Sequence, residues 1–299
     1  MNENDKIKLK EPLSYIDQVK RLKDEHRIII NDEKNALRIL KQVNYYKLMG
    51  YALEFVDPND KEKYIDCSIE KLYDLYIFDS KFKNMLLRFI GYIEVEFKTK
   101  IANYLSNTYG SECLMEKCFF NDYKIEGDIS AYESLIDGFN KEVERRNDNP
   151  IIQHHIEKYS GHFPLWVSIE FFTFGDAITL FRLMFENDKK ECFGKIKDKL
   201  YGWLLNLREI RNKCAHNNRL YNVVLKQQVS LFRNDKYNID SIDKRKMLAS
   251  LIAVKRMLNN DDRWKELLEE LRQLIDEYKD DVSYESLGFT NDWIKILNS

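Results

Sequence analysis

Apolar residues recur every three to four positions along most of the chain, which is the spacing of one helix face. The longest such pattern begins at Ser68 and continues for more than forty residues without a proline. We expect one shared apolar face over this segment, with a break in the helix near Asp79. The apolar positions of the face are Leu72, Leu75, Phe78, Phe82, Leu86, Phe89, Ile93, Phe97 and Ile101.

Shorter helical patterns flank this segment on both sides. Glycine (10 residues) and proline (4 residues) are scarce, which favours long helices over many short strands. The sequence therefore predicts an all-α fold with three parts, namely an N-terminal helical segment, a central helical domain and a C-terminal helical extension. We place these parts at 1–60, 61–225 and 226–299. Residues 1–11 are predicted to be frayed and 223–240 to form a loop.

The stretch from Trp203 to Asn222 changes character along its length. It begins as an amphipathic helix and becomes a dense polar sequence, whereas a surface helix normally keeps a continuous polar face. Cations, amides and an imidazole together are the groups that bind and cleave a phosphodiester. The alternative is a helix C-terminus that carries cations because they favour the helix dipole. The polar residues are Arg208, Arg211, Asn212, Lys213, His216, Asn217, Asn218 and Arg219.

Helical spacing constrains how these side chains could cooperate. Asn212 and His216 lie about 40° apart around a helix, so the Asn212 amide could fix the imidazole tautomer. Arg211 and His216 lie about 140° apart and do not converge on one phosphate if the helix is unbroken. Either the helix bends or ends between them, or a two-fold dimer pairs Arg211 of one copy with His216 of the other.

Charge is concentrated in the same region. The chain as a whole carries a net charge of −2, so any nucleic-acid surface must be local. Residues 195–219 contain seven Lys or Arg and two acids, an excess of five positive charges. We predict that Arg208, Lys213 and Arg219 contact RNA phosphates.

Two acidic residues lie within otherwise apolar segments, Glu94 and Glu170. A buried carboxylate needs a cation or several hydrogen-bond donors. For Glu94 we expect Arg208 or Arg211 as the partner, and the alternative is partial exposure at the edge of the apolar face. Four aromatic residues near the N-terminus either stack on bases or pack the first helices onto the body, and packing is the preferred interpretation. These are Tyr45, Tyr46, Tyr51 and Phe55.

Several function classes find no support in the sequence. No GxGxxG, Walker or HExxH pattern is present, and His154, His155 and His162 lack metal-ligand spacing. No apolar segment is long enough to span a membrane. The five cysteines form no CxxC pair and are expected to be reduced thiols. We therefore expect a soluble cytoplasmic protein that uses no metal or cofactor.

Residues 205–222, LNLREIRNKCAHNNRLYN, resemble the Arg-Asn-x3-His signature of the HEPN (higher eukaryotes and prokaryotes nucleotide-binding) superfamily. They resemble more closely its Abi-like branch, the abortive-infection proteins of the AbiD/AbiF type. The segments 43–55, 78–101 and 163–181 fit the same branch in the same order. The resemblance spans roughly 12–225 and weakens after about 240. Asn217 and Asn218 stand where a second His or Ser is expected.

The resemblance implies an all-α HEPN-type bundle and a metal-independent endoribonuclease whose site is completed by dimerisation. The motif residues fall on Arg211, Asn212 and His216, and Glu94 and Glu170 match acids of the family's segments. The implied partners are RNA, including small structured RNAs, and a second copy of the chain, with no DNA and no membrane. Two functions stay open, a toxin-type RNase in phage defence and a HEPN protein that binds RNA or a partner without cutting.

Overall fold

The computed structural model describes residues 11–232, 241–258 and 260–298. Helices dominate these residues, and the described strands form only two small antiparallel pairs, so the predicted all-α fold is confirmed. The first pair joins β1 (Val56–Asp57) to β2 (Asp60–Tyr64), and the second joins β3 (Lys124–Ile125) to β4 (Ile129–Ser130). The predictions made for 1–10 and 233–240 lie outside the described residues.

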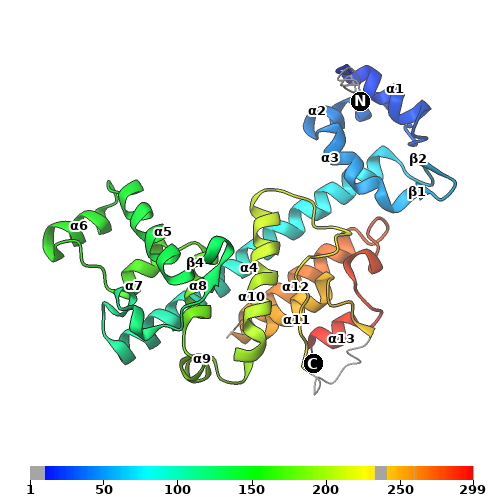
Figure 1. Cartoon of the computed structure of the whole chain (residues 1–299). Helices are drawn as coiled ribbons and strands as arrows, with labels where there is room; N and C mark the ends of the chain where they lie inside the picture. Colours follow the sequence, from blue (N-terminus) through cyan, green and yellow to red (C-terminus); the bar gives the residue numbers. More distant parts are fainter. Residues whose placement is uncertain (1–10, 233–240, 259, 299) are drawn as a thin grey trace, which may run out of the picture.

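Helix α4 (Ile69–Tyr109) is the axis of the molecule and runs obliquely through it (Figure 1). Its 41 residues make a helix about 60 Å long. The Ser68 hydroxyl caps its first turn, and it ends at Gly110, whose φ of 97° suits glycine. The predicted break near Asp79 is wrong, because the helix continues through this residue and all nine predicted apolar positions are buried.

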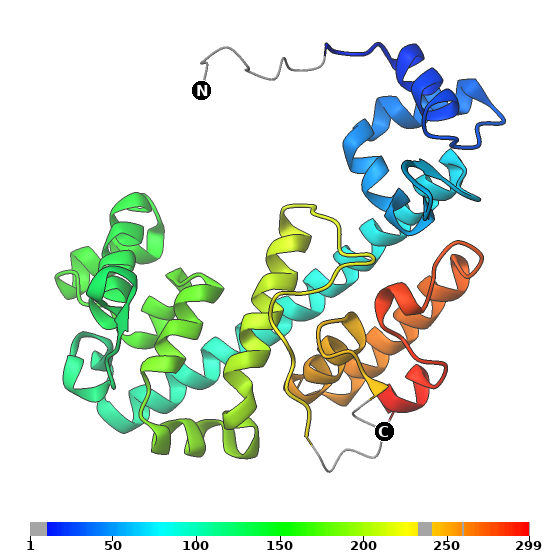
Figure 2. The same ribbon diagram turned by 45° about the vertical axis from the view of Figure 1, so that its right-hand side comes forward.

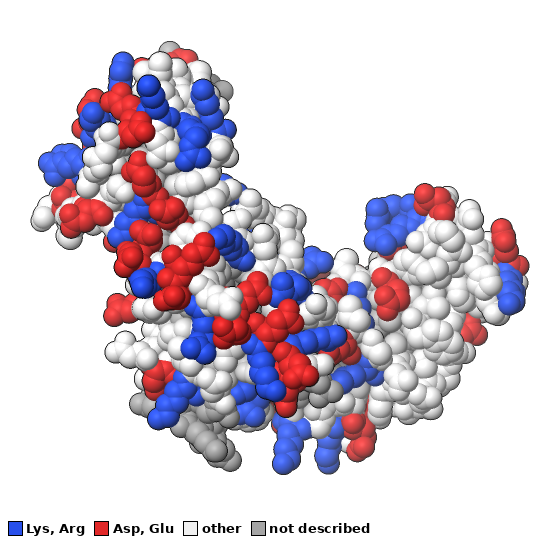
Figure 3. All heavy atoms as spheres, turned by 180° about the vertical axis from the view of Figure 1, so that it is seen from behind, with Lys and Arg blue, Asp and Glu red and all other residues white. Residues whose placement is uncertain are grey.

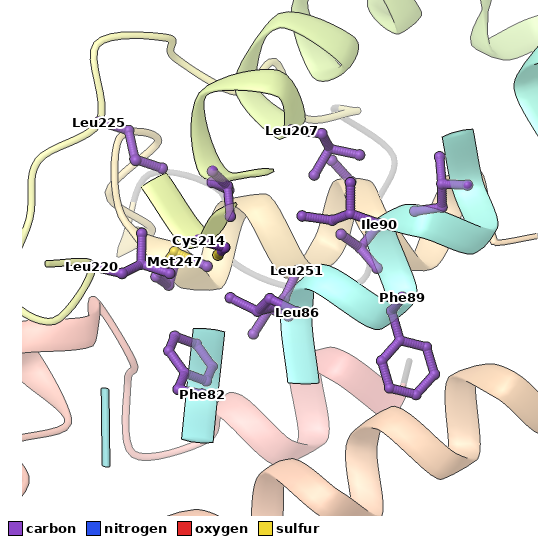
Figure 4. Packing of buried hydrophobic residues seen from close by; sticks show 14 of the residues in the cluster. Phe82, Leu86, Phe89, Ile90, Leu207, Cys214, Leu220, Leu225, Met247 and Leu251 are labelled. Carbon is purple, nitrogen blue, oxygen red and sulfur yellow. The ribbon is translucent and has the colours of Figure 1, made fainter. Parts of the chain in front are cut away.

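Helix α10 (Lys197–Ala215) crosses α4 near its middle (Figure 1). Figure 4 shows buried side chains from both helices and from α11 (Met247–Met257) meeting at this crossing. Burial of this apolar surface is the main stabilising term for the arrangement. The labelled residues from the three helices include Phe82, Leu86, Ile90, Leu207, Cys214, Met247 and Leu251.

The N-terminal segment sits at the first end of α4 (Figure 1). It consists of α1 (Tyr15–Asp24), α2 (Glu33–Gln42), α3 (Tyr45–Met49) and the 3-10 helix η1 (Gly50–Phe55). Side chains of Ser14, Asp32 and Asn44 cap its three α-helices, as their position before apolar periodic segments predicts. These helices bury their apolar faces against one another and against α4.

A second group of elements surrounds the other end of α4 (Figure 2). After the short 3-10 turns η2 (Cys113–Met115), η3 (Lys117–Phe119) and η4 (Glu126–Asp128), the chain forms five further α-helices before the turn η6 (Gly194–Ile196). They are α5 (Ala131–Arg145), α6 (Pro150–Tyr159), α7 (Leu165–Ser168) with the 3-10 helix η5 (Ile169–Phe171), α8 (Phe174–Leu183) and, after it, α9 (Glu186–Phe193).

The C-terminal residues pack along α4 through α11, α12 (Asp261–Glu277), η8 (Glu285–Leu287) and α13 (Trp293–Asn298). Ion pairs join α12 to α4, among them Arg263 to Glu96 at 2.6 Å and Arg88 to two glutamates of α12. Because these contacts run along the shared axis, the third predicted part is attached to the second over a long surface. The boundaries of the three parts stay a prediction.

The space-filling view shows a broad hollow between the N-terminal segment and the group around α5 and α6 (Figure 3). Lys and Arg are mixed with Asp and Glu over most of this face (Figure 3). The ribbon views place the C-terminal end of α10 between the same two arms (Figures 1 and 2). Among the described residues, none of the helices has the length and apolar character needed to cross a membrane.

Candidate active site at the end of helix α10

Helix α10 ends in a regular C-terminal motif. The N–H of His216 still donates to the carbonyl of Asn212, at 3.0 Å, so His216 keeps its helical position. Asn217 follows with a φ of 50°, and the next N–H, of Asn218, donates to the carbonyl of Lys213 at 2.8 Å. This is the Schellman arrangement, in which Asn is favoured at the left-handed position. The helix end therefore explains Asn217, the first of the two asparagines after the motif histidine.

Arg211 and His216 both reach the surface but leave the helix in different directions. His216 is exposed, and the Arg211 side chain is 39% exposed. Since the helical hydrogen bond persists as far as His216, the two Cα positions stay about 140° apart around the axis. A bend that would bring them together is absent from this turn. One chain alone does not place both side chains on the same phosphate.

Asn212 is exposed and lies against Arg211. Its Oδ1 accepts from Nη1 of Arg211 at 3.4 Å. Within the described part of the chain no hydrogen bond joins the Asn212 amide to the imidazole of His216. The expected role of Asn212 in fixing the imidazole tautomer therefore has no counterpart in these contacts.

A buried ion pair on α4 holds the chain that follows α10. Nζ of Lys83 lies 3.1 Å from Oδ2 of Asp79 and donates to Oδ1 of Asn217 at 2.7 Å. Asp79 is fully buried, and its carboxylate accepts from the N–H of Leu220 and of Tyr221, the latter at 2.7 Å. Two backbone donors and a cation thus fix the segment that contains the motif histidine.

Tyr51 from η1 completes this cluster, and Cys214 lies beside it. The Tyr51 hydroxyl donates to Oδ2 of Asp79 at 2.7 Å. Burial, and then the Asp79 carboxylate, raise the pKa of Tyr51, so the hydroxyl stays a donor. Burial raises the pKa of the Cys214 thiol to about 12, with Asp79 adding to the shift and Lys83 opposing it. A protonated thiol is a poor nucleophile, so Cys214 serves packing.

Asp79 and Lys83 were missed as site residues, although the sequence contains a signal for them. Asp79 stands seven residues from both Leu72 and Leu86 on the predicted apolar face, so a charge occupies a core position. Lys83 follows at the i+4 spacing of a helical ion pair. A charge at a core position with a partner one turn away indicates a buried pair.

Hydrogen bonds of Tyr221 join the segment after α10 to the N-terminal segment and to the C-terminal residues. Its hydroxyl donates to the carboxylate of Glu54 in η1 at 3.0 Å. The same hydroxyl accepts from the N–H of Ser283, at 3.0 Å, and Ser286 donates to Glu54 at 2.7 Å. The segment after α10 is therefore held by α4, by the N-terminal segment and by the C-terminal residues.

Glu94 is a partly buried carboxylate with two cations. Its side chain is 16% exposed, and Oε1 lies 2.9 Å from Nζ of Lys98, which also donates to the carbonyl of Phe172 at 2.7 Å. Nε of Arg211 lies 4.0 Å from the other oxygen. Of the two expected partners, Arg211 is present at the edge of ion-pair distance. Lys98 was missed, and Arg208 lies elsewhere, beside Gly175.

The basic residues of 195–219 do not form one patch. Lys197 and Lys213 are separated by about 24 Å along the helix axis. Lys197 pairs with Glu186 and Asp198, and Arg219 donates to the carbonyl of Gly50. Lys213 is half-buried and has no ion pair within the described ranges. Near His216 the local positive charge therefore rests on Arg211 and Lys213, with Arg219 occupied by a structural contact.

Glu170 lies apart from the motif residues. It is exposed in η5 and lines a groove of about 310 Å³ against α4, together with Trp166 and Asn103. No described contact joins it to Arg211 or His216. In the described part of the chain, no group of three or more His, Cys, Asp or Glu side chains is arranged to hold a metal ion.

Comparison with known proteins gives one match. A family model described as Abi-like protein matches residues 38–222, which is more than half of the chain. The matched range includes α4, α10 and every predicted site residue. No curated protein matches the chain, and no solved structure does.

Replacing Lys83 by Met should strongly destabilise the fold, because it leaves the buried Asp79 carboxylate without its cation. We expect a loss of about 3 to 5 kcal/mol in the free energy of unfolding, measured by urea denaturation. Lys81→Met is the matched control on the same helix, since its pair with Glu277 is exposed. The control should lose no more than about 1 kcal/mol.

The double variant Asp79→Asn with Lys83→Met separates pairing from general disruption. Because both charges are then absent, its loss should be smaller than the sum of the two single losses. Equal losses for Lys83→Met and Lys81→Met would show that the buried pair does not hold this segment.

Proposed function

The chain belongs to the Abi-like protein family, and we propose from this premise that it acts in abortive infection, a defence against phage, as a metal-independent endoribonuclease. In this proposal His216 is the general acid or base, and Arg211 binds the reacting phosphate. Lys213 contributes further positive charge toward the RNA. The HEPN assignment belongs to the same proposal.

The observation that carries the proposal is an exposed histidine side chain on a backbone segment that buried contacts hold in place. The imidazole of His216 is exposed at the helix end and forms no hydrogen bond or ion pair within the described ranges, while the next residue is held by the buried Lys83. Structural histidines elsewhere in the chain differ, because His155 and His162 use their ring nitrogens in local contacts. A free imidazole on a rigid support can accept or donate a proton to a ligand.

The chemistry needs no metal ion. A base removes the proton of the ribose 2′-hydroxyl, and the 2′ oxygen forms a bond to phosphorus. The bond from phosphorus to the 5′ oxygen then breaks, and that oxygen takes a proton. The products are a 2′,3′-cyclic phosphate and a 5′-hydroxyl. A guanidinium beside the phosphate stabilises the charge that develops on its oxygens.

The 140° separation of Arg211 and His216 supports a site shared between two copies of the chain. A two-fold axis near the end of α10 would place Arg211 of one copy opposite His216 of the other. The C-terminal end of α10 lies between the two arms in both ribbon views, where a second copy could approach (Figures 1 and 2). The proposed enzyme is accordingly a homodimer.

A second candidate function is an RNA- or partner-binding protein of this family that does not cut. One observation favours it. The Glu94 carboxylate lies 4.0 Å from Arg211, so it both attracts this guanidinium and repels an approaching phosphate. The exposed His216 favours the first function, since binding alone does not require an imidazole.

Wild-type protein should cleave total RNA in the presence of EDTA and leave 2′,3′-cyclic phosphate ends. His216→Ala should abolish this cleavage without changing the urea midpoint, because His216 forms no contact that supports the fold. His154→Ala is the matched control, another histidine remote from α10, and should cleave as wild type does.

Two results would count against this function. Cleavage by His216→Ala at the wild-type rate would remove histidine from the mechanism. Binding of RNA by the wild type without any cleavage, with or without added metal, would favour the binding function.

Glu94→Gln should impair cleavage by misplacing Arg211. It should also lower the free energy of unfolding by about 1 to 3 kcal/mol, because a partly buried charged pair with Lys98 is lost. Glu96→Gln is the matched control on the same helix, since Glu96 pairs with Arg263 and not with Arg211. The control should lose stability and keep its cleavage rate. Equal rates for the two variants would show that Glu94 does not act on Arg211.

A further inference from the structure

A groove of about 650 Å³ crosses the N-terminal segment between the start of α1 and the turn from α2 to α3. Its lining combines aromatic, amide and cationic side chains with apolar ones such as Leu13 and with one acid, Glu11. The polar and aromatic residues that line it include Tyr15, Arg21, Lys41, Asn44, Tyr45 and Tyr46.

Tyr46 is the most exposed large aromatic residue of the described chain, at 77%. Its ring and that of Tyr45 meet in a T-shaped arrangement, with centroids 5.4 Å apart. Most of the Tyr46 side chain is nevertheless open to solvent. Tyr15, on the α1 side of the groove, is also exposed. The preferred interpretation of the N-terminal aromatics as packing residues holds for the buried Tyr51 but not for Tyr46.

Two cations line the same groove. Arg21 forms an ion pair with Glu25, with Nε and Oε2 3.1 Å apart. Lys41 is exposed and forms no ion pair within the described ranges. Open aromatic faces beside a cation are the combination that binds unpaired nucleotides, because each base stacks and its phosphate is neutralised.

Contacts between distant parts of the sequence connect the groove to the segment that follows α10. Helix α3 is five residues long, so the Cα atoms of Tyr46 and Gly50 are separated by about 6 Å along its axis. The carbonyl of Gly50 accepts a hydrogen bond from Arg219, three residues after His216. Lys47, between them, lies near Lys83, which lowers its pKa after the larger effect of burial.

We propose that this groove binds unpaired nucleotides of an RNA strand, with Tyr46 as the stacking surface and Lys41 as the phosphate contact. The identity of the strand as the substrate rests on the proposed function. An apolar peptide fits less well, because Leu40 and Val43 of the lining are already buried. Leu13 is the exposed apolar side chain of the lining, and it lies among the hydroxyl, amide and ammonium groups of Tyr46, Asn44 and Lys41. The groove would hold a few nucleotides of the strand, so that the phosphates that follow them reach the end of α10.

The test measures binding of a fluorescent single-stranded 12-nucleotide RNA with 2′-O-methyl riboses to the full chain. This probe lacks the 2′-hydroxyl nucleophile, so binding is measured whether or not the protein is an RNase. Tyr46→Ala should weaken binding about five-fold or more, and Tyr46→Phe should stay within about two-fold of wild type. Lys41→Ala should weaken binding and make it less dependent on salt. The control is Tyr284→Ala, an exposed tyrosine in the C-terminal part.

The outcomes separate this proposal from the proposed function. Loss of binding in Tyr46→Ala supports the groove even if no variant cleaves RNA, and an increase in KM without a change in kcat on native RNA supports it further. Wild-type affinity in Tyr46→Ala and Lys41→Ala overturns the groove even if the wild type cleaves RNA. Equal loss in Tyr284→Ala, no binding by the wild type, or conversion of Tyr46→Ala from dimer to monomer in light scattering also overturns it.

Discussion

The buried pair of Asp79 and Lys83 is the interaction on which the arrangement of the candidate site depends. Two charges removed from water are stable only when their remaining hydrogen-bonding capacity is used. Here Asp79 accepts from Tyr51 and from two backbone N–H groups, and Lys83 donates to Asn217. These partners come from the N-terminal segment and from the segment after α10, so the pair joins both of them to the axis helix at one point.

This anchoring explains why the end of α10 is rigid while its functional side chains stay at the surface. The Schellman motif satisfies the last carbonyls of the helix, and Lys83 fixes Asn217 directly after His216. The imidazole of His216 therefore takes part in no hydrogen bond or ion pair among the described contacts. The same rigidity keeps Arg211 and His216 apart, which is why the proposed reaction needs a second copy of the chain.

Periodicity predicted the long helix and its buried face, because helix formation and burial follow from local spacing of apolar residues. It failed at Asp79, where an acidic residue suggested a break, since the donors that stabilise this carboxylate lie about 140 residues away in sequence. The motif residues were found from their chemistry and from the family resemblance. The pair of Glu94 and Lys98 was missed although its i+4 spacing is visible in the sequence, whereas the link from Arg219 to Gly50 depends on how distant segments pack.

The most direct test of a shared site mixes two inactive proteins. Arg211→Ala and His216→Ala chains are unfolded together in urea, refolded at equal amounts, and assayed for RNA cleavage in EDTA. If Arg211 and His216 of one site come from different copies, each mixed dimer keeps one complete site, and the mixture should recover about a quarter of wild-type activity. No recovery from a mixture that contains mixed dimers, or full activity of a wild-type monomer, would contradict the account.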